Sequence, residues 1–150
     1  LFVDSDGSFF EYFRSSWEEQ LLTEEIPRSD VVGWYRNRDR KRTSLRVPYQ
    51  QRGRWRPLYP DFIFARHVDG KVVLDILDPH DPTRADAVPK AKGLSRYAEK
   101  HGARFGRIQL LAKIGNDLRR LEVNDSEVRK AINVVDSSDA LVHLYETAGL

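Results

Sequence analysis

The chain has 150 residues, of which 40% are hydrophobic and 32% are charged, and its formal net charge is +2. These values are typical of one globular domain with its own core, and they exclude wholesale disorder. The chain has no cysteine, which excludes disulfides and thiolate metal sites, and no apolar run approaches the roughly 20 residues that cross a bilayer, so we expect no membrane partner.

The first predicted element is an amphipathic helix over residues 8–25, because aromatic and leucine side chains recur there at helical spacing and Pro27 follows. Residues 30–35 are rich in strand formers and predict the first strand. Residues 45–50 predict a short second strand, in which Pro48 indicates an edge position or a bulge.

A basic block overlaps this region, with nine Lys or Arg residues and one acid between Arg36 and Arg56. The rest of the chain has 16 basic and 22 acidic residues, so the block is a candidate phosphate-binding surface. Interleaved aromatic residues suit stacking against bases. The alternative is a solvated loop that only keeps the domain soluble. The candidate DNA-binding residues are Arg36, Arg38, Arg40, Lys41, Arg42, Arg52, Arg54 and Arg56.

Residues 59–66 and 71–78 predict a β-hairpin, since two apolar, β-branched or aromatic runs flank the turn sequence HVDG. A helix is predicted over 86–102, a buried strand over 105–114 and a short strand at 121–123. Two helices follow, from Asp125 or Ser126 to about residue 134 and over 138–147. This order predicts an α/β fold with a mixed sheet flanked by helices.

Acidic residues inside apolar strands mark a candidate metal or catalytic site, because a lone buried carboxylate is costly. The register of the hairpin decides which of them meet. A three-residue loop, 68–70, places Asp61 opposite Leu77 and diagonal to Asp75. A two-residue loop, 69–70, places Asp61 opposite Asp78 and turns Asp75 to the other face. The position of Gly70 favours the three-residue loop.

The run WEEQLL…VVGWYRNR…YPDFIFA…VVLDI resembles the PD-(D/E)xK restriction-endonuclease-like superfamily. More narrowly, it resembles the nuclease region that follows the helicase motor in type III restriction enzymes and related helicase-linked defence proteins. The resemblance covers about residues 9–114. It implies a restriction-endonuclease-like fold and a Mg²⁺-dependent (or Mn²⁺-dependent) endodeoxyribonuclease. Glu18 would be the helix acid, Asp61 and Asp75 the metal ligands, and Asp78 a further candidate ligand.

The sequence departs from the family at one position, because the family has lysine two residues after the second acid and this chain has Leu77. One explanation is that Lys90 or Lys92 on the next helix takes over the lysine's role. Another is that Asp78-Pro79-His80 is the functional half-motif, with His80 in place of lysine. A third is that the centre is inactive and the domain only binds.

The chain begins at Leu1 and has no methionine, so we expect residues 1–150 to be a single domain from the C-terminal part of a longer helicase-linked protein. The expected partners are DNA and the helicase/ATPase portion of that protein, acting in restriction or antiviral defence in the bacterial cytoplasm. The alternative hypothesis is a catalytically silent module that binds DNA or docks on its parent motor. A purely structural domain without nucleic-acid affinity is the third hypothesis.

Overall fold

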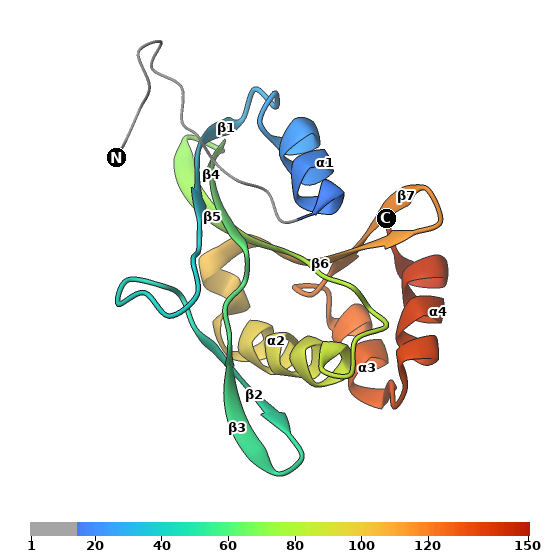
Figure 1. The fold of residues 1–150 in the computed structure, drawn as a ribbon. Coiled ribbons are helices and arrows are strands. Elements are labelled where there is room, and N and C mark those ends of the chain that lie inside the picture. Colours follow the sequence, from blue (N-terminus) through green and yellow to red (C-terminus); the bar gives the residue numbers. More distant parts are fainter. Residues whose placement is uncertain (1–14) are drawn as a thin grey trace.

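The computed structural model describes residues 15–150. Its centre is a five-stranded sheet in the order β1-β4-β5-β6-β7, and a separate two-stranded hairpin, β2–β3, extends away from it (Figure 1). Only the β5–β6 pair of the sheet is parallel. The strands are β1 (Val31–Arg36), β2 (Val47–Gln51), β3 (Arg54–Leu58), β4 (Phe62–Val68), β5 (Lys71–Pro79), β6 (Phe105–Ile114) and β7 (Asp117–Glu122).

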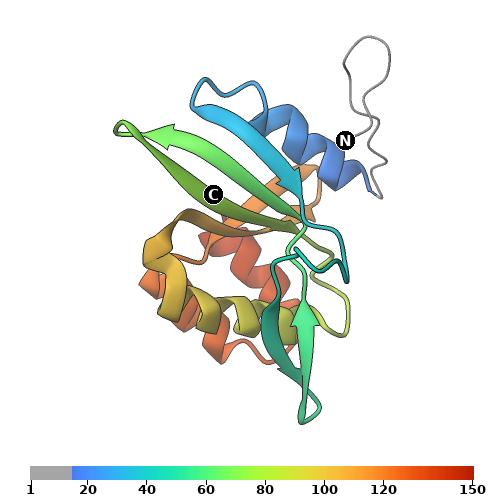
Figure 2. The same ribbon diagram turned by 90° about the vertical axis from the view of Figure 1, so that its left-hand side faces the viewer.

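Helices cover both faces of the sheet, which confirms the predicted mixed α/β architecture. Helix α1 (Ser16–Glu25) lies on one face, and α2 (Ala87–His101), α3 (Ser126–Val134) and α4 (Ser138–Ala148) gather on the other (Figure 2). A short 3-10 helix, η1 (Gly102–Arg104), links α2 to β6. None of the helices in residues 15–150 is long and apolar enough to span a membrane.

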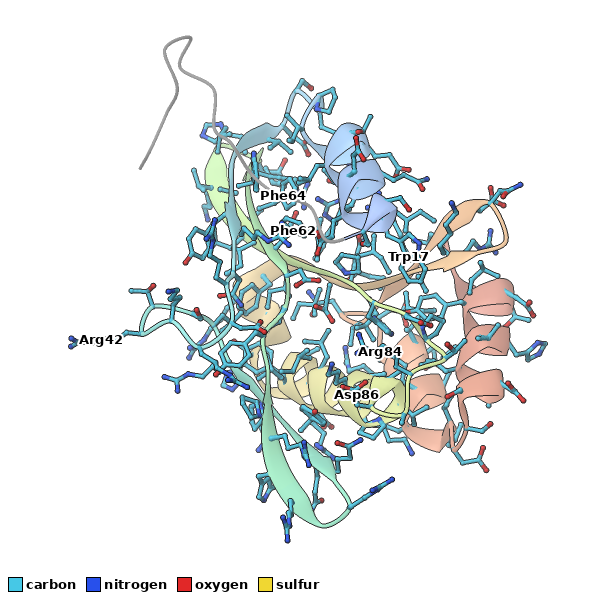
Figure 3. All side chains as sticks on the ribbon, viewed as in Figure 1. Trp17, Arg42, Phe62, Phe64, Arg84 and Asp86 are labelled. Carbon is cyan, nitrogen blue, oxygen red and sulfur yellow. The ribbon has the colours of Figure 1, made fainter. Side chains whose placement is uncertain are left out.

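The two faces carry two separate hydrophobic cores because successive strand residues point to opposite sides. On the α1 side, Phe62 and Phe64 of β4 lie between the sheet and the helix (Figure 3), where they pack with Leu77 and two leucines of α1. On the other side, residues of β5 and β6 such as Ile76 pack against α2, α3 and α4. The C-terminal half of β5 is therefore buried on both faces.

Helix α1 starts later than predicted. Ser15 has an extended backbone (φ −149°) and caps the helix by accepting a hydrogen bond from the Glu18 amide, so a continuous helix through Ser15 is wrong. The predicted helical residues 8–14 lie outside the described part of the chain. From Ser16 to Glu25 the prediction is confirmed.

Strand β3 was missed by the sequence analysis because four of its five residues are exposed and it carries no apolar alternation. A two-residue turn at Arg52 and Gly53, both with positive φ (49° and 73°), joins it to β2. β2 pairs with β3 and with no other strand among the described residues, which agrees with the edge position that Pro48 indicated.

Downstream, the predicted elements are confirmed with small shifts. β6 has the predicted bounds, Phe105–Ile114, and β7 begins at Asp117, four residues before the predicted strand. The Asp125 side chain caps α3 by accepting hydrogen bonds from the amides of Glu127 and Val128. The last helix runs one residue beyond its predicted end.

Candidate active site

The turn between β4 and β5 decides which acids meet. Asp69 and Gly70 both have positive φ (49° and 75°), so they form a two-residue turn and Val68 pairs with Lys71. The favoured three-residue loop is wrong, because Asp-Gly suits the primed turn whose twist matches that of the flanking strands. As a result Phe62 pairs with Leu77, and Asp61 comes level with Asp78.

Asp75 therefore faces α1 and is separated from the other two acids. Its side chain is fully buried and accepts hydrogen bonds from the guanidinium groups of Arg66 and Arg107, the latter at 2.8 Å. The Arg107 amide donates a further bond at 2.9 Å. The prediction that Asp61 and Asp75 share one metal site is therefore wrong. Asp75 and Leu77 of β5 point to the α1 side of the sheet, whereas Asp78 points to the other side.

Asp61 and Asp78 form the acidic pair that the structure does bring together. The Asp61 amide donates a hydrogen bond of 3.1 Å to the Asp78 carboxylate, which is 4% exposed. Burial and the negative charge of Asp61 raise the pKa of Asp78 well above its usual range, and the positive charge of Lys90 offsets this only in part. Two adjacent carboxylates that repel each other are an arrangement that a divalent cation stabilises.

His80 follows this pair on the chain, and both of its ring nitrogens face protein atoms. Nδ1 lies 3.4 Å from the Asp78 carbonyl oxygen, and Nε2 lies 3.4 Å from the hydroxyl of Tyr145 on α4. Burial, with the charge of Lys90, lowers the pKa of His80 to about 4, so its imidazole is neutral at pH 7. Burial and the charge of Asp78 raise the pKa of Tyr145, which keeps its hydroxyl protonated.

The Asp78 carbonyl oxygen can only accept, so Nδ1 of the neutral ring carries the proton and donates to it. Nε2 then accepts from the protonated Tyr145 hydroxyl. The geometry gives His80 a supporting role, because a neutral ring with both nitrogens in use holds the backbone of Asp78 in place. This contact had no signal in the sequence.

Lys90 is the lysine that α2 directs to the acidic pair. It lines the same pocket as Asp61 and Asp78, and its ammonium lies 2.7 Å from the carboxylate of Asp86, one turn earlier. Burial raises the pKa of Asp86, but the hydrogen bond and charge of Lys90 outweigh it, and the net pKa is lowered. Lys92, the other predicted candidate, is not among the residues that line the pocket.

Glu18 reaches the pocket from the first turn of α1. Its two carboxylate oxygens accept hydrogen bonds of 3.0 Å and 2.9 Å from Arg36, whose side chain is only 12% exposed. Glu18 also lines the pocket to which Asp61 and Asp78 contribute. Arg36 serves this internal ion pair and does not belong to the exposed basic surface on which it was predicted.

One pocket of about 630 Å³ is lined by Glu18, Asp61, Asp78, His80 and Lys90. Its walls come from α1, the β3–β4 connection, the end of β5 and the start of α2. Arg84 and Asp86 mark its α2 side and Trp17 its α1 side (Figure 3). Sequence reasoning missed the pocket residues Trp17, Tyr59, Arg84 and Asp86. Of these four, only Asp86 had a local signal in the sequence, which was its i,i+4 spacing to Lys90.

The donor set fits Mg²⁺ or Mn²⁺ bound together with a substrate. Within residues 15–150, no three His, Asp or Glu side chains converge as a ready-made metal cage. Mg²⁺ in phosphate-processing sites is held by one or two carboxylates, with waters and substrate phosphate oxygens completing its shell. Asp61 and Asp78 supply such a carboxylate pair, and Glu18 stands in the same pocket.

The basic block is almost entirely exposed. Arg42 projects from the loop between β1 and β2 (Figure 3), and the arginines of the β2–β3 hairpin are exposed as well. The connection that follows this hairpin, Leu58-Tyr59, is one wall of the pocket. The exposed members are Arg38, Arg40, Lys41, Arg42, Arg46, Arg52, Arg54 and Arg56.

A sequence model of the YagJ family matches residues 1–149. "Protein YagJ" of Escherichia coli (strain K12) is 32% identical to the chain over 142 residues, which are 94% of this chain and 58% of that protein. The chain thus spans little more than half the length of this relative. No solved structure matches the chain. The family match covers nearly every residue, and the chain belongs to the YagJ family.

Proposed function

We propose that this chain is a metal-dependent nuclease domain that hydrolyses phosphodiester bonds in DNA. The observation that carries the proposal is the Asp61–Asp78 pair at one end of the β4–β5 hairpin, with Lys90 in the same pocket. The proposal includes Mg²⁺ or Mn²⁺ as the cofactor and a restriction-endonuclease-like fold. The order of helix α1, strands β1, β4 and β5, helix α2 and strand β6 supports that fold. The position of Asp75 departs from the resemblance, because this acid pairs with arginines on the α1 side of the sheet.

In this mechanism Asp61 and Asp78 would hold the metal ion, which would supply charge stabilisation at the scissile phosphate and an activated water. Lys90 donates hydrogen bonds and positive charge, and Asp86 holds its ammonium at the pocket wall. Tyr145 holds the His80 ring, and His80 in turn contacts the carbonyl oxygen of Asp78. Arg84 lines the pocket and presents a guanidinium to an incoming phosphate.

The test is cleavage of labelled single-stranded and double-stranded DNA by the purified chain in Mg²⁺ or Mn²⁺. We expect Asp61→Asn and Asp78→Asn each to reduce the cleavage rate by at least about 100-fold, because each removes a ligand charge from the metal site. Glu99→Gln is the matched control, since Glu99 is an exposed acid of α2 that does not line the pocket. Cleavage that survives both aspartate substitutions would rule out this site.

A second candidate function is a catalytically silent module that binds DNA or docks on a motor protein. The observation in its favour is His80, whose neutral ring is fully engaged by Tyr145 and the Asp78 carbonyl group and so is a poor substitute for the missing lysine. This function predicts salt-sensitive DNA binding without metal-dependent cleavage. The defence role and the helicase/ATPase partner expected from the resemblance belong to both candidate functions as proposals.

A further inference from the structure

The β2–β3 hairpin carries an exposed tryptophan on an arginine-rich strand. Trp55 is 65% exposed, and its neighbours Arg54 and Arg56 are exposed as well. The guanidinium carbon of Arg96, on α2, lies 5.8 Å from the centroid of the indole ring. An indole supported by a cation, with most of its surface open to solvent, is a platform on which another flat ring can stack.

The hairpin is firmly attached to the body of the protein, so this platform has a fixed position. Tyr49 of β2 is 4% exposed and packs on Gly93 of α2, where an added Cβ would come within 2.5 Å of the Tyr49 Cβ. Val47 and Leu58 are buried in the same core. The absence of a side chain at Gly93 allows this close approach of strand and helix.

The charge of the hairpin selects the kind of partner. Residues 46–59 include four arginines and no acid. Arg52 is at the tip, in the turn, and Arg54 and Arg56 flank the tryptophan. Arginines spaced along an extended strand suit a partner that carries a row of negative charges, and an exposed indole between them suits a partner that also carries flat rings.

The hairpin also leads directly to the pocket. Pro57, Leu58 and Tyr59 continue the chain from Trp55 and line the pocket that holds the acidic pair. Asp61 lies six positions after Trp55, which corresponds to about 20 Å of extended chain at most. A polymer that follows β3 from its tip therefore arrives at the candidate catalytic residues within a few nucleotides.

We infer that the β2–β3 hairpin binds a single-stranded segment of nucleic acid, with an unpaired base stacked on Trp55 and the arginines beside it at the phosphates. In a duplex the bases stack on one another and offer the hairpin only their phosphates, whereas an unpaired base has a free face for the indole. The inference rests on the proposed function, since it specifies that the strand entering the pocket is unpaired next to the cleavage site.

The experiment measures the affinity of the chain for a labelled 12-nucleotide oligothymidine and for a 12-base-pair duplex, both in EDTA. We expect Trp55→Ala to weaken oligothymidine binding by about 10-fold, since stacking of one base contributes about 1–3 kcal/mol. Trp55→Phe should recover most of this loss, and duplex binding should change by less than about twofold. Tyr35→Ala is the control, because Tyr35 is an exposed aromatic residue (46%) of β1, in the other sheet.

Two results would overturn the inference. If Trp55→Ala weakens oligothymidine and duplex binding equally, the hairpin contacts only nucleic-acid backbones. If Trp55→Ala leaves oligothymidine binding unchanged, the indole does not bind a base, and a protein partner becomes the alternative. Because binding is measured without metal, it is independent of hydrolysis. Trp55-dependent binding without Mg²⁺-dependent cleavage would support the inference and reject the nuclease proposal. Cleavage without Trp55-dependent binding would support the nuclease proposal and reject the inference.

Discussion

Leu77 occupies the position at which the resemblance expects lysine, and its surroundings explain why no lysine stands there. The side chain is fully buried with Phe62, Phe64 and Leu111 on the α1 side of the sheet. An ammonium group at this place would lose its hydration without gaining a partner, which is costly. In the proposed nuclease the lysine comes from another element, and Lys90 of α2 lines the pocket.

Substitution of the two lysines of α2 tests this assignment. Lys90→Ala should lower the rate of metal-dependent DNA cleavage by at least about 100-fold, which is the usual contribution of a positioned proton donor or acceptor. Lys92→Ala should cleave at the wild-type rate, because Lys92 does not line the pocket. Metal binding, measured by calorimetry, should persist in both variants. Equal activity of the two variants would contradict the role of Lys90.

At the scale of elements, α1 is attached to the sheet by charge as well as by apolar packing. Glu25, at its C-terminal end, is 1% exposed and bonds with Arg107 of β6 and Arg120 of β7. Arg107 continues the network to Asp75. Asp75, which the sequence suggested as a metal ligand, thus helps to hold α1 on the sheet. The first turn of the same helix carries Glu18, which lines the pocket.

Breaking this network should destabilise the protein. Burial raises the pKa of Glu25, but hydrogen bonds and charges from Arg107 and Arg120 outweigh it and lower the pKa. A depressed pKa means that this stabilisation is present above the unfolded-state pKa and is lost as the pH falls through the folded-state pKa. At pH 7, Glu25→Gln should lower the free energy of unfolding by about 2 kcal/mol, because Arg107 and Arg120 lose their shared buried carboxylate and keep only Asp75 and Glu24 as acidic partners.

Urea denaturation measures this change, and Glu19→Gln is the control, since Glu19 lies exposed on the same helix. The control should stay within about 0.5 kcal/mol of the wild type. A loss below about 1 kcal/mol in Glu25→Gln would show that apolar packing alone holds α1 in place.

At the scale of the whole molecule, the candidate site forms where segments far apart in sequence meet. Glu18 comes from α1, Asp78 from the end of β5 and Lys90 from α2, and Asp61 immediately precedes β4. Tyr145 reaches the same place from α4, 65 residues beyond His80. The β2–β3 hairpin contributes Pro57 and Leu58 to one wall of the pocket and carries exposed arginines on the same strand.

Metal binding at this site should depend on pH. The raised pKa of Asp78 means that this carboxyl holds its proton to higher pH than usual, and a metal ion must displace that proton. The affinity for Mn²⁺ should therefore increase as the pH rises from 6 to 8. The rise in thermal unfolding temperature on adding Mn²⁺ should be larger at pH 8 than at pH 6 as well.

Calorimetry and thermal denaturation at the two pH values measure both effects. Asp78→Asn should bind Mn²⁺ weakly at both, whereas Glu99→Gln should behave as the wild type. If Asp78→Asn binds Mn²⁺ as tightly as the wild type at both pH values, Asp78 is not a ligand.

Much of the fold followed from local patterns. The turn residues around Asp69-Gly70, the apolar runs on either side and the cap at Asp125 predicted β4, β5 and α3, because these signals act over a few neighbouring residues. β3 escaped detection because its stability comes from pairing with β2 and not from an apolar face of its own.

The sequence by itself determined the class of fold, the acidic hairpin and the basic block. Only the tertiary structure decided that Asp61 meets Asp78, that Asp75 pairs with arginines, and that Lys90 rather than Lys92 lines the pocket. The physical reason is the two-residue period of a strand: a shift of one residue in the turn moves every following side chain to the opposite face. Local sequence favoured a turn at this place, and the backbone conformation of Asp69 set its length.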